Sequence, residues 1–339
     1  MRFLRQEFNL QNTVFGESLV FAGTNPERLL QARIIPGSVA LRSKYLDFDQ
    51  GVIIYEEGKD YAVDHENGAL CRTPGSRIPD YRDHVFYGRE RFDHREAADF
   101  GNARFTVYCD YAFAADEPPM LSSEPGNRLF PDCFEKKQMT IGIIGDSITY
   151  GCDATVSERS YAWQWADALE RKYHGVSFRV YNKAVGGMAS ERGVTAFERE
   201  LAPLKPDIVL IGFGMNDQNR GASGDIATPP GKFMANLNAI CASAKKANPD
   251  ALIALVSPML PNPRWRHTSG RLLELRAVLR GIADNNGYSF ADVTSCWERM
   301  LARKSVESLA ANNVNHPNDF GHWIYAQLVK AATIEQEDK

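Results

Sequence analysis

The chain has 339 residues, which is long for one domain and comfortable for two. Apolar residues make up 44% of the sequence, enough to build a sizeable core, so a disordered chain is excluded. The net charge is −4 and the pI is near 6.0, with no basic run, which argues against a nucleic-acid partner.

Targeting signals are not recognisable in the sequence. The first residues, from Met1 to Phe8, lack the apolar core of a signal peptide, and no apolar run approaches the roughly 18 residues that span a membrane. The six cysteines are scattered, without a Cys-x-x-Cys pair or zinc-ligand spacing. We expect reduced thiols, with disulfides as the alternative. The expectation is a cytoplasmic protein with no membrane partner; the alternative is a precursor from which an export signal was removed.

Short alternating segments and turn signals fill the chain from about residue 15 to 113. The apolar residues at odd positions of 105–113 alternate with Thr106, Tyr108 and Asp110, a period of two that suits a half-buried strand. Residues 60–71 predict a hairpin closed at Asn67-Gly68. We find no convincing helix of four turns here. The simplest account is a small all-β sandwich.

The pattern changes in the second half. Residues 114–138 are rich in prolines and charges and predict a linker. From Met139 onward, strands are expected to alternate with helices, which predicts an α/β fold with a doubly wound parallel sheet. We therefore divide the chain into a β-sandwich accessory domain with its linker, 1–135, and an α/β domain, 136–339. The expected strands are 139–145, 176–181, 207–213, 251–256 and 288–292, and the expected helices are 160–173, 190–201, 231–247, 270–285 and 319–333.

Four short blocks carry groups suited to chemistry. Residues 142–150 place Ser147 in a sharp turn after a buried strand, at the sheet edge where ligands bind in α/β folds. Alone this is a weak signal. It is followed by the glycines at 186–187, by Asn216 within residues 214–217, and by His316 within residues 313–317. A serine hydroxyl, backbone amides beside glycine, a side-chain amide and a histidine are the groups that acyl transfer requires.

The order, spacing and strand context of these blocks resemble the SGNH hydrolases, also called GDSL-type esterases. The resemblance covers about residues 139–330 and none of the β-rich half. It implies a flavodoxin-like fold, with Ser147 as nucleophile and His316 as base. It also implies an oxyanion hole made by the backbone amides of Ser147 and Gly187 and the side chain of Asn216. His322 is expected to pack within the last helix. No cofactor is expected, and no metal, because the Asp-His pairs at 83–84 and 93–94 lack ligand spacing.

One position departs from the family pattern. The family usually has aspartate three residues before its histidine, where this chain has Asn313. An asparagine oxygen can accept the imidazole N–H and fix the tautomer, but it adds no charge to stabilise imidazolium. A backbone carbonyl, such as that of Val314 or Asn315, is the alternative partner of His316, and we favour it.

Three tryptophans are candidates for contact with substrate. Trp265 lies in a proline-rich loop after an expected strand, and we predict it to be an exposed wall of the substrate pocket. Trp163 and Trp323 are expected in the core.

The β-rich half placed before such a catalytic domain is similar to certain carbohydrate deacetylases. The leading hypothesis is a cofactor-independent serine esterase that removes O-acetyl groups from a sugar or oligosaccharide. One alternative is a lipase or thioesterase acting on longer acyl chains. Another is a non-catalytic carbohydrate-binding protein of the same fold. The β-rich half is expected to shape the substrate cleft or to form a homo-oligomer contact.

Overall fold

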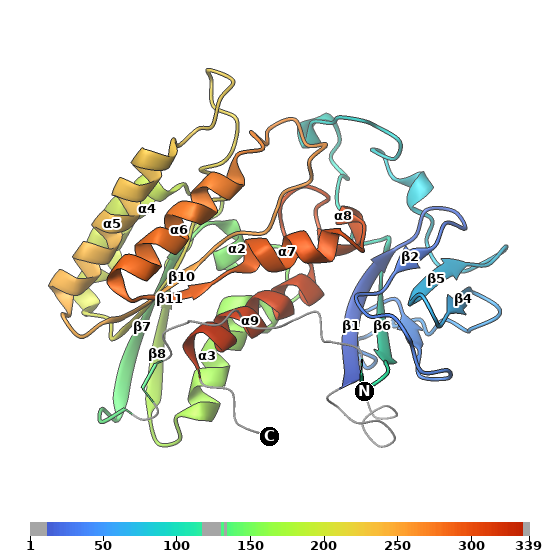
Figure 1. Ribbon diagram of the computed structural model, residues 1–339, viewed down its shortest axis with the longest axis horizontal. Coiled ribbons are helices and arrows are strands. Elements are labelled where there is room, and N and C mark those ends of the chain that lie inside the picture. Colours follow the sequence, from blue (N-terminus) through green and yellow to red (C-terminus); the bar gives the residue numbers. More distant parts are fainter. Residues whose placement is uncertain (1–11, 117–129, 132–133, 335–339) are drawn as a thin grey trace. The chain divides into compact units, whose positions relative to one another are not determined.

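The computed structural model describes residues 12–116, 130–131 and 134–334 (Figure 1). Most of the predicted linker lies outside these residues. The chain forms two compact units. The first, which we call the β unit, contains Met1–Ser122, Arg264–Arg266 and Glu298–Gly321. The second, the α/β unit, contains Ser123–Pro263, His267–Trp297 and His322–Lys339.

The β unit holds two three-stranded antiparallel sheets. One has the order β1-β6-β3 and the other β2-β5-β4. A single core cluster joins side chains from both, among them Leu41 and Val107 of the first sheet and Leu70 of the second, as a sandwich requires. The predicted strand and hairpin are confirmed as β6 and the β4–β5 pair, but β6 is buried on both faces and not half-buried as its alternation indicated, since Thr106, Tyr108 and Asp110 are buried as well. The bounds are β1 (Thr13–Val20), β2 (Glu27–Arg28), β3 (Ala40–Arg42), β4 (Tyr61–Asp64), β5 (Ala69–Arg72) and β6 (Thr106–Ala112).

The α/β unit is built on five parallel strands in the order β11-β10-β9-β7-β8. Counted within the unit this is the flavodoxin-like order 2-1-3-4-5, which confirms the predicted fold class. The strand order reverses between β7 and β9, and ligands of such sheets bind at that switch point. The bounds are β7 (Gln138–Gly145), β8 (Ser177–Asn182), β9 (Ile208–Gly212), β10 (Leu252–Val256) and β11 (Ser289–Ala291).

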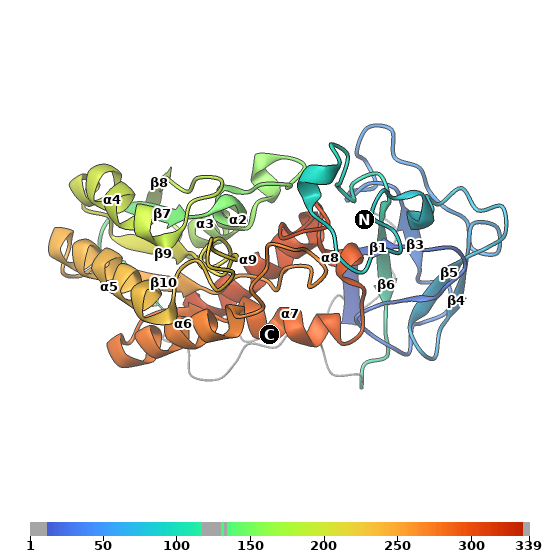
Figure 2. The ribbon, with the colours of Figure 1, turned by 90° about the horizontal axis from the view of Figure 1, so that it is seen from above.

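Helices cover both faces of this sheet (Figures 1 and 2). Helices α4, α5 and α6 share a core cluster with Val209 and Ile211 of β9. On the other face α3 and α9 lie together, and Trp165 Nε1 donates to Thr333 Oγ1 at 2.9 Å. The five predicted helices are confirmed as α3 (Tyr161–Lys172), α4 (Ser190–Glu200), α5 (Pro230–Ala247), α6 (Leu272–Asn286) and α9 (Asp319–Thr333).

Among the residues that the structure describes, three further α-helices were not expected from the sequence. Two of them, α2 (Ser147–Tyr150) and α8 (Val306–Leu309), are single turns, too short to show a helical period. The third, α7 (Val293–Leu301), follows β11 after one residue. Within the described ranges, no helix has the length and apolar character needed to cross a bilayer.

Candidate active site

Ser147 is the first residue of α2, which follows β7 after one residue, Asp146. The Asp146 side chain caps the helix by accepting the N–H of Ile148 at 3.0 Å. The Asp146 backbone N–H donates to the carbonyl of Gly212 in β9 at 3.1 Å. These bonds fix the turn at the switch point of the sheet, and Ser147 is 5% exposed there.

Two glycines make this turn tight. Gly145 of β7 pairs with Gly212 of β9. A Cβ atom on Gly145 would lie 2.4 Å from the Gly212 carbonyl oxygen, and one on Gly212 would lie 2.3 Å from Thr149 Oγ1. Such distances are far below van der Waals contact. The glycine of the Gly-Asp-Ser sequence is therefore a steric requirement of this strand end.

Gly187 lies in the tight turn Val185–Met188, which follows β8. The Met188 N–H donates to the Val185 carbonyl at 3.1 Å, and the Val185 N–H donates to Gly145 at 3.1 Å. Gly187 has φ +73°, as the third residue of a type II turn requires. No atom lies within 4 Å of a Cβ placed on it, so its backbone borders open space.

Asn216 follows β9 and is tied to the Gly187 turn. Its Nδ2 donates to the Met188 carbonyl at 3.2 Å. A side-chain amide has two N–H groups, so this bond orients the side chain and leaves the second N–H for another acceptor. Ser147, Gly187 and Asn216 thus all follow the carboxyl ends of three adjacent strands, β7, β8 and β9.

Asp217 supports this arrangement and was missed by the sequence analysis, although it is the next residue in the same block. It is fully buried and accepts the backbone N–H and the hydroxyl of Ser190, at 3.1 and 2.6 Å. Asn236 in turn donates to the Ser190 hydroxyl at 2.9 Å. Burial raises the pKa of Asp217, while the Ser190 bonds act in the opposite direction. Asp217 joins the loop after β9 to the start of α4.

His316 belongs to the β unit, in the loop that precedes α9. It is half-buried. The backbone N–H of His316 donates to the side-chain oxygen of Asn312 at 3.0 Å, and the backbone carbonyl of His316 accepts the N–H of Ala311 at 2.9 Å. The same Asn312 oxygen accepts the N–H groups of Val314 and Asn315 at 3.0 and 2.9 Å. Asn312 therefore organises this loop, a role that the sequence analysis did not assign to it.

Asn313 has a different environment. Its backbone is left-handed, with φ 58°, a conformation that asparagine tolerates better than most residues. Its side chain is fully buried beside the hydroxyl of Tyr81. Burial raises the pKa of Tyr81 to about 12, while the charge of Arg264 acts against that rise.

The segment that carries His316 is anchored in the β unit by buried polar contacts. Lys304 and Glu17 form an ion pair at 2.6 Å with both side chains fully buried. The Tyr111 hydroxyl donates to the same Glu17 carboxylate at 2.6 Å. Ser308 Oγ accepts the N–H of Val20 at 2.8 Å, and Asn102 Nδ2 donates to the Ala310 carbonyl at 2.9 Å.

His322 is fully buried in the α/β unit, which matches the packing role expected for it. Its Nδ1 accepts the N–H of Tyr161 at 3.4 Å, so its Nε2–H donates to the Cys152 carbonyl at 3.0 Å. The ring stacks on Tyr161 with an interplanar angle of 17°.

The expectation for Trp265 is wrong. Its side chain is 4% exposed and packs with Phe86 and Phe92 inside the β unit, and its indole N–H donates to His94 Nδ1 at 3.0 Å. A proline-rich loop indicated exposure, but residues 264–266 pair with Phe92 and are built into that unit. Trp163 and Trp323 were expected in the core. Trp163 is 39% exposed and Trp323 is partly exposed.

Comparison with models of known protein families assigns the chain to one of them. Residues 143–324, more than half of the chain, match the GDSL-like lipase/acylhydrolase family. A search of curated proteins finds no match.

Two similar solved structures are an α/β hydrolase enzyme, LAE5, from the metagenome of Lake Arreo, Spain, and the acetylxylan esterase Axe2 from Geobacillus stearothermophilus. LAE5 is 22% identical, with a TM-score of 0.48 over 57% of this chain and 94% of its own. Axe2 is 22% identical, with a TM-score of 0.48 over 57% of this chain and 93% of its own. The family match supports a carboxylic ester hydrolase. The chain belongs to the GDSL-like lipase/acylhydrolase family.

Proposed function

We propose that this protein is a cofactor-independent serine esterase that removes short acyl groups, above all O-acetyl groups, from a carbohydrate. One observation carries the proposal. Ser147 begins a capped turn at the switch point of the sheet, and Gly187 and Asn216 follow the two neighbouring strands. The substrate class is supported by the resemblance to carbohydrate deacetylases that carry a β-sandwich before the catalytic domain.

The first half of the mechanism forms an acyl-enzyme. His316 accepts the proton of the Ser147 hydroxyl while Oγ attacks the ester carbonyl carbon. The negative charge that develops on the carbonyl oxygen is stabilised by the backbone N–H groups of Ser147 and Gly187 and by the amide of Asn216. Each such donor typically contributes about 3 kcal/mol in the transition state. The C–O bond to the sugar then breaks, and His316 returns its proton to the leaving sugar oxygen.

The second half releases the acid. Water enters, His316 takes one of its protons, and the oxygen attacks the acyl carbon through a second tetrahedral intermediate. Cleavage of the bond to Oγ gives the carboxylic acid, and the proton on His316 returns to Ser147. The pairing of His316 with Ser147 is what the resemblance to the family implies.

The first test is a pair of alanine variants. Ser147→Ala and His316→Ala are each expected to abolish hydrolysis of p-nitrophenyl acetate while the melting temperature stays nearly unchanged, because each removes a reacting group. Matched controls are Ser177→Ala and His174→Ala, which change exposed residues of the same types. Asn216→Ala is expected to lower kcat by about 10²–10³, the effect of losing one oxyanion donor. Full turnover in either Ser147→Ala or His316→Ala contradicts the mechanism.

Two further measurements separate the alternative functions. Rates on p-nitrophenyl esters of increasing chain length should fall steeply beyond two to four carbons for a sugar deacetylase, whereas a lipase or thioesterase keeps its activity on longer chains. A fluorophosphonate probe should label Ser147. A carbohydrate-binding protein without catalytic function would leave the serine unlabelled.

A further inference from the structure

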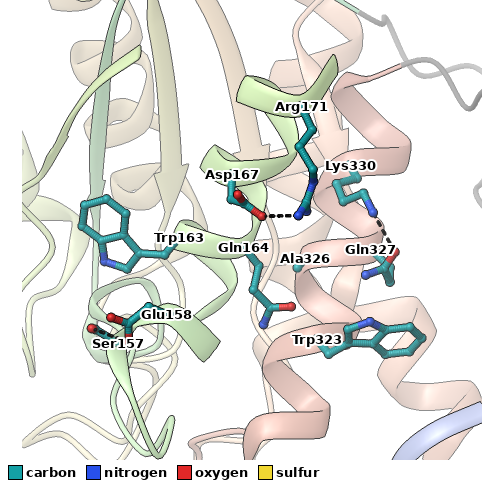
Figure 3. Close-up of a pocket in the computed structure, with 10 residues that line it drawn as sticks. All are labelled: Ser157, Glu158, Trp163, Gln164, Asp167, Arg171, Trp323, Ala326, Gln327 and Lys330. Atoms are coloured by element: carbon teal, nitrogen blue, oxygen red, sulfur yellow. Dashed lines mark hydrogen bonds and ion pairs between the residues drawn. The ribbon is translucent and has the colours of Figure 1, made fainter. Parts of the chain in front are cut away.

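A pocket of about 810 Å³ lies in the α/β unit along α3 and α9 (Figure 3). Its volume falls within the range of small-molecule sites. None of the residues assigned above to the chemistry of Ser147 lines it.

Two tryptophans line this pocket. Trp163 comes from α3 and Trp323 from α9, with Gln164 between them in the view (Figure 3). Trp163 leaves 39% of its surface exposed, and Trp323 is partly exposed. Keeping apolar surface in water costs about 25 cal/mol per Å², so an exposed and a partly exposed indole on adjacent helices of one pocket indicate a surface that a ligand covers.

The charges of the pocket cancel. It holds two carboxylates, Glu158 and Asp167, and two cations, Arg171 and Lys330. Arg171 pairs with Asp167 at 2.6 Å, and Lys330 donates to the side-chain oxygen of Gln327 at 3.1 Å. Because these cations already have partners and carboxylates lie among them, a phosphate or a polyanion is disfavoured. Four charged groups also make the pocket a poor site for an acyl chain.

The amide groups complete the polar surface. Gln164 donates its Nε2–H to the Arg159 carbonyl at 2.6 Å, so its side-chain oxygen is the group that a ligand can address. Gln327 uses its oxygen for Lys330, so its NH₂ is the corresponding donor. The pocket thus offers an amide acceptor, an amide donor and two indole rings.

We propose that this pocket is a second binding site, for a neutral oligosaccharide. A pyranose ring has C–H groups on its faces and hydroxyls around its edge. The C–H groups fit the electron-rich faces of Trp163 and Trp323, and the hydroxyls both donate and accept, as the two glutamines require. The site holds the sugar chain and does not touch the reacting atoms, so binding here does not depend on the chemistry proposed for Ser147.

The test is isothermal titration calorimetry on the full chain carrying Ser147→Ala, with xylohexaose, cellohexaose and mannohexaose as probes. We expect at least one of these neutral hexasaccharides to bind. We expect its affinity to fall at least about tenfold when Trp163→Ala or Trp323→Ala is added, the loss of one aromatic stacking contact. Phe48→Ala, which removes an aromatic side chain 73% exposed in the β unit, is the control and should leave the affinity unchanged.

Three outcomes overturn the proposal: no binding of any of the three probes, undiminished binding in both tryptophan variants of a folded protein, or tighter binding of an oligogalacturonate than of the neutral probes. Hydrolysis of p-nitrophenyl acetate separates this result from the proposed function. Trp163→Ala in the otherwise native chain should keep that activity, whereas failure of the esterase mechanism would show in the Ser147 and His316 variants.

Discussion

At the scale of single residues, the loop before His316 depends on a side chain next to the one that the family pattern singles out. Asn312 accepts three backbone N–H groups with one oxygen, including that of His316. The side chain of Asn313 is fully buried. The sequence identifies residue types that suit a reaction, but two neighbouring asparagines differ only in the direction of their side chains, which the fold decides.

Asn312→Ala is therefore expected to lower activity more than a change at Asn313. Losing the shared acceptor leaves three part-buried N–H groups to find other partners, at a cost of about 2 kcal/mol, and should reduce kcat on p-nitrophenyl acetate at least about tenfold. Asn313→Gly keeps the left-handed backbone without strain and should stay within a few-fold of the parent. If Asn313→Gly loses as much activity as Asn312→Ala, the side chain of Asn313 does hold the imidazole.

At the scale of elements, the strands and helices predicted correctly are those whose formation depends on local sequence patterns. The five predicted strands and five predicted helices of the α/β unit are each marked by apolar runs or helical spacing in their own sequence, and the Gly-Asp-Ser turn follows the first of these strands. No local sequence pattern indicates that residues 298–321 belong to the β unit. It depends on the Glu17–Lys304 pair, whose members are 287 residues apart. Contacts of this separation leave no periodicity in the sequence.

The buried pair gives a stability prediction. Lys304→Met leaves the Glu17 carboxylate buried without its cation and should lower the free energy of unfolding by about 3–5 kcal/mol, as measured by urea denaturation. Combining it with Glu17→Gln removes that charge and should recover part of the loss. Lys59→Met, which breaks an exposed pair with Glu56, is the control and should cost less than about 1 kcal/mol. A Lys304→Met cost as small as that of the control would show that the pair does not anchor this segment.

At the scale of the whole molecule, the two units are interleaved along the sequence. The residue proposed as base is numbered within the C-terminal half, yet it belongs to the β unit, together with strands from the N-terminal half. The sequence-based division at residues 135 and 136 therefore separates Lys304 from Glu17, and the Ala310 carbonyl from Asn102. A change of composition along a chain marks where a sequence pattern changes. It does not show which later segment folds back into the first unit.

This interleaving predicts the behaviour of residues 136–339 expressed alone. Without Glu17, Lys304 has no carboxylate to offset its burial, so segment 298–321 should leave its native conformation and carry His316 with it. We expect a chain without measurable hydrolysis of p-nitrophenyl acetate and with new protease cleavage within 298–321, detected by mass spectrometry. Adding residues 1–135 as a separate chain should restore part of both properties if the buried contacts reform. Full turnover by residues 136–339 alone would contradict this prediction. It would mean that His316 keeps its active position without residues 1–135 and the contacts that they make with the loop before α9.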